Sequence, residues 1–246
     1  MRKFTFATMS VLGVLTVSSA AMAHADTTTV LATDSIYAVG NQSGNAPSYG
    51  GTAPTGISVL SGTSYFTFSA TGSVTVNGGG NYNNADGIGS ASPEDNFGTS
   101  SLSGINSPTA GYIAAVFLAA GGPSGSAPTA LDFTGAGGTS FSTLSPLIDQ
   151  VFFVGDGLTG NGTGSSQQFY VPTGATELYL GLADTCGYYG GPSCLGDNSG
   201  SFTVNYDQAG GTVPPPPTVP EPSSLFLLGT GALGACGVIR RRFANC

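Results

Sequence analysis

Short runs rich in β-branched and aromatic residues recur along the middle of this chain, separated by clusters of Gly, Pro, Ser and Asn. The runs are ISVL, SYFTFSAT, SVTVN, YIAAVFLAA, ALDFTG, QVFFVG, QQFYVP, ELYLGLA and SFTVNY. Several alternate between apolar and polar positions, as half-buried strands do. The alternating apolar positions are Phe66, Phe68 and Ala70; Leu178, Leu180 and Leu182; and Phe202, Val204 and Tyr206. No long amphipathic helix pattern is visible, so we expect an all-β fold, a single β-sandwich over residues 57–207.

The N-terminus has the pattern of a secretory signal over residues 1–25. Two basic residues precede an apolar run, and small residues follow at the spacing that a signal peptidase recognises. Cleavage fits after Ala23 or after Ala25, and the second choice would remove His24. Residues 26–56 are then expected to form an N-terminal segment that contains the first strand.

The C-terminus carries a stalk and a short apolar segment. Residues 208–218 are rich in Gly and Pro, which favours an extended linker. Leu225 to Ile239 form an apolar run that would be roughly 22 Å long as a helix, short of the ~30 Å hydrocarbon layer. The basic residues that follow would hold its end on the cytoplasmic side. We therefore expect a temporary membrane tether within residues 219–246.

This tail resembles the PEP-CTERM sorting signal of Gram-negative bacteria that produce exopolysaccharide. The resemblance rests on a VPEP motif, a glycine-containing apolar span and a basic cluster. The matching residues are Val219, Pro220, Glu221, Pro222, Arg240, Arg241 and Arg242. It implies transient anchoring in the inner membrane, recognition by an exosortase with cleavage near Pro220 to Pro222, and release or attachment at the cell surface. Such a tail specifies a destination and no activity.

The distribution of charge excludes most chemistry. The formal net charge is −8, and no Lys or Arg lies between Lys3 and Arg240. Nucleic-acid and nucleotide binding need such cations, and a serine or cysteine nucleophile usually needs a His or Lys as its base. His24 is the only histidine. We therefore expect no catalytic residues, and a carboxylate pair for glycoside hydrolysis among the acidic residues is the least favoured alternative.

Four cysteines in an exported chain suggest one disulfide. Cys236 lies in the C-terminal apolar run and Cys246 lies beyond the arginines, so Cys186 and Cys194 are the pair expected in the oxidising compartment. Their bridge would close a loop of about nine residues and contribute roughly 2.5 kcal/mol.

The segment ELYLGLAD, followed by this loop and GDNSGSFTVNY, resembles the calcium-dependent galactophilic lectins of the PA-IL type. The resemblance implies a jelly-roll or galactose-binding-like sandwich and a calcium ion whose open positions bind sugar hydroxyls. By motif, Asp184, Asp197 and Asn198 would supply side-chain ligands, and Cys194 and Val76 would supply main-chain carbonyls. Hard oxygen ligands of this kind suit calcium.

The loop also departs from the lectin pattern. The loop is about six residues longer than its counterpart in these lectins. The His and Gln side chains that help to hold galactose in the lectins have no assignable counterpart here. The same GDNSGSF stretch could serve only as a tight turn. The functional hypotheses are thus a lectin-like surface or matrix protein that binds glycan through calcium, a structural matrix component with no specific ligand, and, less favoured, an ice-binding protein.

Overall fold

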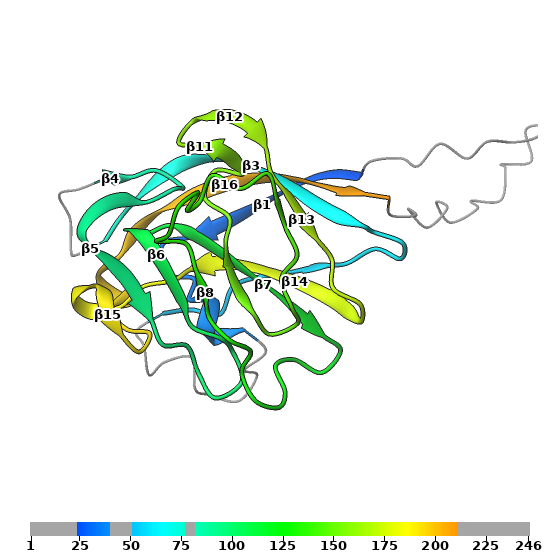
Figure 1. The fold of residues 1–246 in the computed structure, drawn as a ribbon, viewed down its shortest axis with the longest axis horizontal. Helices are drawn as coiled ribbons and strands as arrows, with labels where there is room; N and C mark the ends of the chain where they lie inside the picture. Colours follow the sequence, from blue (N-terminus) through cyan, green and yellow to red (C-terminus); the bar gives the residue numbers. More distant parts are fainter. Residues whose placement is uncertain (1–23, 40–50, 77–81, 211–246) are drawn as a thin grey trace, which may run out of the picture. The chain divides into compact units, whose positions relative to one another are not determined.

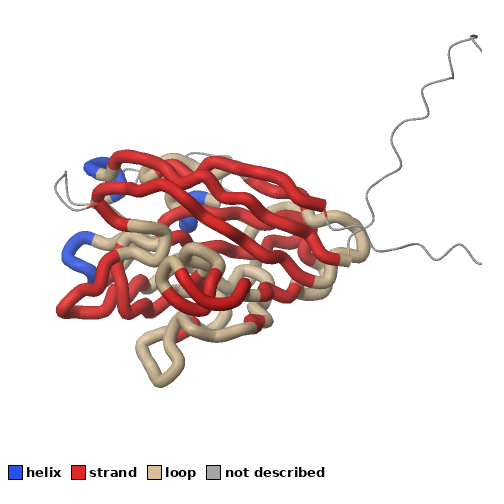
Figure 2. The backbone as a smooth tube through the Cα atoms, turned by 90° about the horizontal axis from the view of Figure 1, so that it is seen from above, coloured by secondary structure: helices blue, strands red, loops and turns tan. Residues whose placement is uncertain are grey.

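The computed structural model describes residues 24–39, 51–76 and 82–210 of the 246-residue chain. About 50% of the structure is strand, and it has no helix of seven or more residues. Within the described ranges, helical structure is confined to the short turns η1 (Ile36–Ala38), η3 (Cys186–Tyr188) and η4 (Leu195–Asp197), as Figure 2 shows. The predicted all-β fold is confirmed.

The first main sheet contains six strands in the order β1-β16-β3-β13-β9, with β4 also pairing with β3 (Figure 1). Its strands are β1 (His24–Leu31), β3 (Tyr65–Thr75), β4 (Tyr82–Asn83), β9 (Thr143–Leu144), β13 (Gln168–Tyr170) and β16 (Ser199–Ala209). The apolar positions Phe66, Phe68 and Val74 of the predicted runs SYFTFSAT and SVTVN lie in the single long strand β3. The whole of β1 pairs with β16, starting from His24 opposite Gln208. The described β domain therefore includes residues from the predicted N-terminal segment.

The second main sheet has the order β10-β7-β14-β2. Its strands are β2 (Gly56–Ser58), β7 (Ile113–Ala119), β10 (Val151–Phe153) and β14 (Ala175–Leu182). The first six residues of β7 are all buried, which explains its continuous apolar sequence. In β14 the alternating leucines Leu178, Leu180 and Leu182 are buried, as their spacing predicts.

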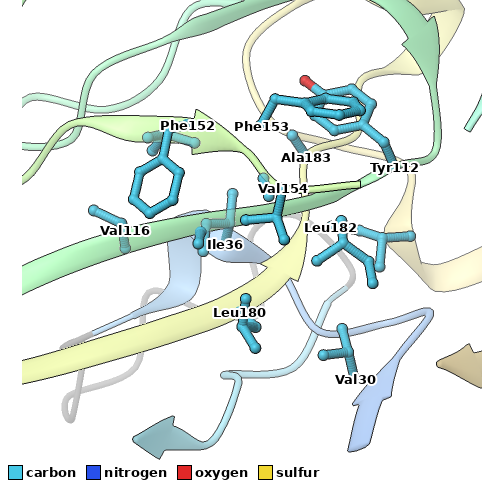
Figure 3. Close-up of a cluster of buried hydrophobic side chains, with 14 of the residues drawn as sticks. Val30, Ile36, Tyr112, Val116, Phe152, Phe153, Val154, Leu180, Leu182 and Ala183 are labelled. Carbon is cyan, nitrogen blue, oxygen red and sulfur yellow. The ribbon is translucent and has the colours of Figure 1, made fainter. Parts of the chain in front are cut away.

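Aromatic side chains join the two main sheets into a sandwich. Phe66 of β3 lies 5.8 Å from Phe117 of β7, and Phe169 of β13 lies 5.6 Å from Phe152 of β10, measured between ring centroids. All four rings are fully buried. Figure 3 shows one part of the core, where aliphatic side chains from β1, β7 and β14 pack together. Burial of these large apolar side chains is the main stabilising contribution to the fold.

A third, four-stranded sheet has the order β15-β5-β6-β8, and a hairpin joins β11 (Leu158–Gly160) to β12 (Thr163–Ser166). The sheet consists of β5 (Ile88–Asn96), β6 (Ile105–Ala110), β8 (Leu131–Asp132) and β15 (Tyr189–Gly190). The apolar pattern does not predict β5 or β6, because IGSASPEDN and INSPTA are mostly polar and contain proline. The pairing of β5 with β6 shifts register between Gly89 and Glu94, at the kind of irregularity where a strand tolerates proline.

The remaining terminal predictions fall outside the described residues. These are the signal peptide up to residue 23, the stalk after residue 210 and the C-terminal apolar segment with its arginines. No helix in the described part of the chain has the length and apolar character needed to cross a membrane.

Candidate functional site

Two of the predicted ligands, 14 positions apart in the sequence, meet at one end of the sandwich. Asp184 lies two residues after the end of β14, and Asn198 lies directly before β16. The Asn198 amide Nδ2 donates a hydrogen bond of 2.8 Å to Asp184 Oδ2 and another of 3.2 Å to the main-chain carbonyl of Ala32. Both side chains are only 6% exposed, and Asn198 Oδ1 has no hydrogen-bond partner. This pair is therefore internal to the domain rather than open to solvent.

The other three predicted ligands occupy different surroundings. Asp197 is exposed at the end of η4, and Cys194 caps the start of this turn in a left-handed conformation with φ +65°. Val76 follows Thr75, which pairs with Ser199, so the strand register brings Val76 toward Asn198. The structure thus brings Val76 to the same end as the buried pair, whereas the Asp197 side chain is exposed.

The loop between the two buried residues is held by the predicted Cys186–Cys194 disulfide, whose Cα atoms lie 5.3 Å apart. Strand β15 within this loop pairs with β5, and Phe97 donates its N–H to the Gly190 carbonyl at 2.9 Å. The loop is thereby fixed against the third sheet. Gly200, in the GDNSGSF stretch, has φ +100°, and a Cβ atom there would lie 2.5 Å from the Ser73 carbonyl oxygen. Only glycine fits this position without strain.

Burial raises the pKa of the Asp184 carboxyl to about 6, the hydrogen bond from Asn198 opposes this shift, and the nearby negative charge of Asp197 adds to it. The amide of Asn198, however, presents its nitrogen to Asp184. In this arrangement one amide oxygen, Asn198 Oδ1, remains available as a buried ligand for a cation.

The sequence patterns did not point to Glu94, a second buried acid whose charge interacts with that of Asp184. Glu94 of β5 is fully buried, and Gly111 N–H donates a bond of 3.3 Å to its Oε2. Burial raises the pKa of the Glu94 carboxyl well above its usual range, and the negative charge of Asp184 raises it further. Asn96, two residues later, donates its amide Nδ2 to the Asp184 carbonyl at 3.3 Å. In the sequence, Glu94 and Asn96 stand two positions apart within a polar stretch, and such a stretch gives no reason to expect burial.

The described residues contain no group of three or more His, Cys, Asp or Glu side chains arranged to hold a metal ion. A cation at this end of the sandwich would therefore depend on at most two carboxylates together with neutral oxygens. Such a mixture is compatible with calcium, which takes carbonyl and amide oxygens as well as carboxylates.

Two exposed aromatic rings lie at the disulfide loop, one of them within it. Phe97 and Tyr189 are 56% and 67% exposed, and their ring centroids are 4.9 Å apart in an edge-to-face arrangement. Tyr189 belongs to β15, and Phe97 immediately follows β5. Together they form a small exposed apolar surface at the disulfide loop.

Comparison with known proteins identifies only the C-terminal segment. Residues 218–242 match the family model of the PEP-CTERM protein-sorting motif, and this match covers the predicted VPEP motif and all three arginines. No curated protein and no solved structure matches the chain, so neither comparison supports the resemblance of the β domain to lectins. The sorting motif identifies the chain as an exosortase-sorted protein that is exported through a membrane-bound stage toward the cell surface or the extracellular space.

Proposed function

We propose that this protein is a non-enzymatic component of the bacterial surface or extracellular matrix, processed by signal peptidase and by an exosortase at the inner membrane of a Gram-negative cell. Its β-sandwich is the mature part, and the C-terminal segment directs it to its destination. The role is that of a compact, weakly charged protein associated with exopolysaccharide.

One observation carries this proposal: the sorting motif follows a β domain without a single Lys or Arg. Such a domain lacks the cations that phosphate ligands require and the bases that activate most nucleophiles. Its buried acids Asp86, Glu94 and Asp184 are directed into the fold, where they contact other protein groups. These features favour a structural or binding role over catalysis.

The test is to follow the full chain in cells that contain an exosortase. We expect the protein in the surface or matrix fraction, and we expect replacement of Pro220, Glu221 and Pro222 by alanine to retain it in the membrane at a higher mass. The double variant Cys186→Ser with Cys194→Ser, which leaves the tail intact, serves as the matched control and should be sorted normally. Equal distribution of the tail variant and the parent chain would refute the sorting role, and release of reducing sugar ends from matrix polysaccharide would refute the non-enzymatic assignment.

A second candidate is calcium-dependent glycan binding at the disulfide loop. It is favoured by the juxtaposition of Asp184 with Asn198 and by the exposed pair of Phe97 and Tyr189. The C–H face of a sugar ring packs well on an aromatic surface, while calcium would coordinate its hydroxyls. A glycan site would then lie across the loop, with Asp197 at its edge.

Glycan arrays probed with the protein in calcium and in EDTA test this candidate. We expect calcium-dependent binding that is lost in the variant carrying Asp197→Ala and Asn198→Ala, and weakened at least tenfold in the variant carrying Phe97→Ala and Tyr189→Ala (about 1.4 kcal/mol). The exposed Leu147, 58% accessible and on a different loop, provides the control Leu147→Ala. Binding that survives the first variant, or no binding to any glycan, would exclude this candidate and leave the structural role unaffected.

A further inference from the structure

Buried polar atoms without hydrogen-bond partners are concentrated at the Asp184 end of the sandwich. Ten such side-chain atoms occur in the described residues, and six belong to residues grouped around Asp184. These six are Tyr37 Oη, Glu94 Oε1, Asn96 Oδ1, Tyr112 Oη, Thr185 Oγ1 and Asn198 Oδ1. All six are oxygens, and each of the six residues is at most 6% exposed. Native proteins normally satisfy buried polar atoms, so such a concentration points to a missing partner.

The topology explains how these oxygens come together. Glu94 and Asn96 share one face of β5, because side chains two apart in a strand point the same way. Leu182 pairs with Ile113, so the residues just beyond this pair, Asp184 and Tyr112, lie at the same end of β14 and β7. Ser35, directly before η1, bridges to Leu182 and thereby brings Tyr37 to this end as well.

Direct contacts join the members of the group. Asn96 and Asn198 both donate to Asp184, at its main-chain carbonyl and its carboxylate respectively. Gly111 N–H, one residue before Tyr112, donates to Glu94 Oε2. The Tyr112 ring packs 5.1 Å from Phe153, and Figure 3 shows its hydroxyl on the side away from Leu180 and Val30. The Ser107 side chain is near enough to that hydroxyl to affect its pKa as a hydrogen-bonding group, although the two do not meet strict hydrogen-bond geometry.

The charge of this group has no protein counterpart. Glu94 and Asp184 are both buried, and the chain has no Lys or Arg between residues 4 and 239. Burying an unpaired carboxylate is costly, so the pair must take up protons or an external cation. A proton on Glu94 would supply one hydrogen-bond donor and would leave most of the other oxygens unsatisfied. A hard cation contacts six to eight oxygens at once and would satisfy both the charge and the unpartnered atoms.

We propose that Glu94 and Asp184, together with neutral oxygens of Asn96, Tyr112 and Thr185, form an internal site for a divalent cation of the calcium class. Its ligands are oxygens only, which disfavours zinc, and their number and variety exceed what magnesium's strict octahedron usually accepts from protein. The cation joins β5 to the end of β14, and so fastens the third sheet to the main sandwich. This site is distinct from the exposed loop site, since it uses Glu94 in place of Asp197, and it does not depend on glycan binding.

The test uses the full chain, purified in detergent, with calcium chloride as the probe. At 10 mM calcium we expect the melting temperature to rise by about 5–10 °C over the value in EDTA, for a dissociation constant of about 0.1 mM. We also expect terbium luminescence sensitised by tyrosine and displaced by calcium, because the chain contains no tryptophan and Tyr112 lies at the site.

Two acid-to-amide variants separate the internal site from the loop. Glu94→Gln should abolish both the calcium-dependent shift and the terbium signal, while the protein in EDTA melts at or above the parent temperature because glutamine has the same shape and never carries a charge. Asp197→Asn makes the same chemical change at an exposed position and should retain both effects. Thr185→Val removes one unpartnered oxygen with little change in shape and should weaken calcium binding several-fold, which keeps the site testable if Glu94→Gln does not fold.

Two results would overturn this inference. The first is no calcium-dependent shift and no displaceable terbium signal in the parent protein, which would mean that protons or water satisfy the group. The second is a calcium effect of undiminished size in Glu94→Gln, or unchanged calcium affinity in Thr185→Val; if the effect also disappears in Asp197→Asn, the cation lies at the exposed loop, which would support the glycan-binding candidate. Neither result would affect the sorting role.

Discussion

Two pairs among the buried acids of the domain, Asp86 with Asp156 and Glu94 with Asp184, differ in the groups that hydrogen-bond to their carboxylates. In the first pair, Asp156 accepts N–H bonds from Leu158 at 2.8 Å and Gly162 at 2.7 Å, and its own N–H donates to Asp86 Oδ1 at 3.0 Å. Only Asp86 Oδ2 lacks a partner there. In the second pair, Glu94 accepts a bond of 3.3 Å from Gly111 N–H at Oε2 and interacts with the Thr185 main chain, and Asp184 accepts a bond of 2.8 Å from the Asn198 side chain. Glu94 Oε1 has no partner, and neutral buried oxygens without partners surround this pair.

This difference separates Asp156, whose carboxylate shapes a loop, from Glu94, which we propose as a cation ligand. Main-chain N–H groups close to Asp156 replace most of the hydrogen bonds that its carboxylate would make with water. The glycines on either side of Asp156 allow the required turn. Glu94 lies within a strand, where the main chain is committed to sheet pairing and offers few free N–H groups. Neither the burial of an acid nor one unpartnered carboxylate oxygen indicates a site, since Asp86 has both; the proposal rests on several unpartnered buried oxygens gathered around Asp184.

The largest effect should come from removing the loop-shaping acid. Asp156→Ala leaves the N–H groups of Leu158 and Gly162 without their acceptor, and we expect the free energy of unfolding to fall by about 3 kcal/mol. Urea denaturation with and without calcium measures it, and the loss should be the same in both conditions. A loss below about 1 kcal/mol would mean that Asp156 does not hold the loop. Stability restored by calcium would mean that the Asp156 pair also responds to the cation, against the distinction between the two pairs.

The disulfide comes next. Cys186→Ser with Cys194→Ser should lower the free energy of unfolding by about 2.5 kcal/mol through the restored freedom of the unfolded chain. Because the loop is docked on β5 beside Asp184, the same variant should also weaken the calcium-dependent rise in melting temperature. Asp156→Ala is the control that should lose stability without losing this rise. An unchanged calcium-dependent rise in the cysteine variant would mean that the disulfide does not support cation binding at Glu94 and Asp184.

The loop-shaping pair should also give a smaller, pH-dependent effect. Burial raises the pKa of Asp86 to about 6, with a further contribution from the charge of Asp156, against an ordinary value of 3.8. A raised carboxyl pKa means that the folded state holds its proton more tightly, so the stability contributed by Asp86 is present below pH 4 and is lost as the pH rises through about 6. Between pH 7 and pH 4.5 we expect this group to add about 1–2 kcal/mol, allowing for its partial solvent exposure.

The measurement is a pair of melting curves against pH for the parent protein and Asp86→Asn. The amide keeps an acceptor for the Asp156 N–H, so the variant should fold and should show a flatter pH dependence than the parent. Identical slopes in the two proteins would contradict the assignment of this proton to Asp86.

The smallest effect should be that of Asp197→Asn. Asp197 is exposed at the end of η4, so its replacement should change the free energy of unfolding by less than about 0.5 kcal/mol. Thermal denaturation in EDTA measures it. A larger loss would mean that Asp197 contributes to the buried pair more directly than its exposure indicates.

Much of the fold could be predicted because the strands of the main sheets repeat a simple pattern. Phe202, Val204 and Tyr206 of β16 alternate with polar residues, and all three are buried as their spacing indicates. Strand β5 could not be predicted in the same way. Its sequence has no apolar alternation and includes Pro93, and its pairing depends on β6 and on a strand of the disulfide loop about 100 residues away.

The candidate site, like the fold, was predictable only in part. The motif around Asp184 and Asn198 pointed to residues that do meet, since the end of β14 and the start of β16 are adjacent in the fold. The amide orientation of Asn198, the exposure of Asp197 and the burial of Glu94 depend on contacts between distant segments. None of these can be read from local spacing.

By itself, the sequence determined the all-β class, the disulfide and the sorting motif, because each is encoded by neighbouring residues: strand alternation, a cysteine pair and a short linear signal. Only the tertiary structure decided which acids are buried together and which of their oxygens have partners. Burial and hydrogen bonding are set where β5, β14 and the disulfide loop come together, and a carboxylate's environment there depends on residues far from it in the chain.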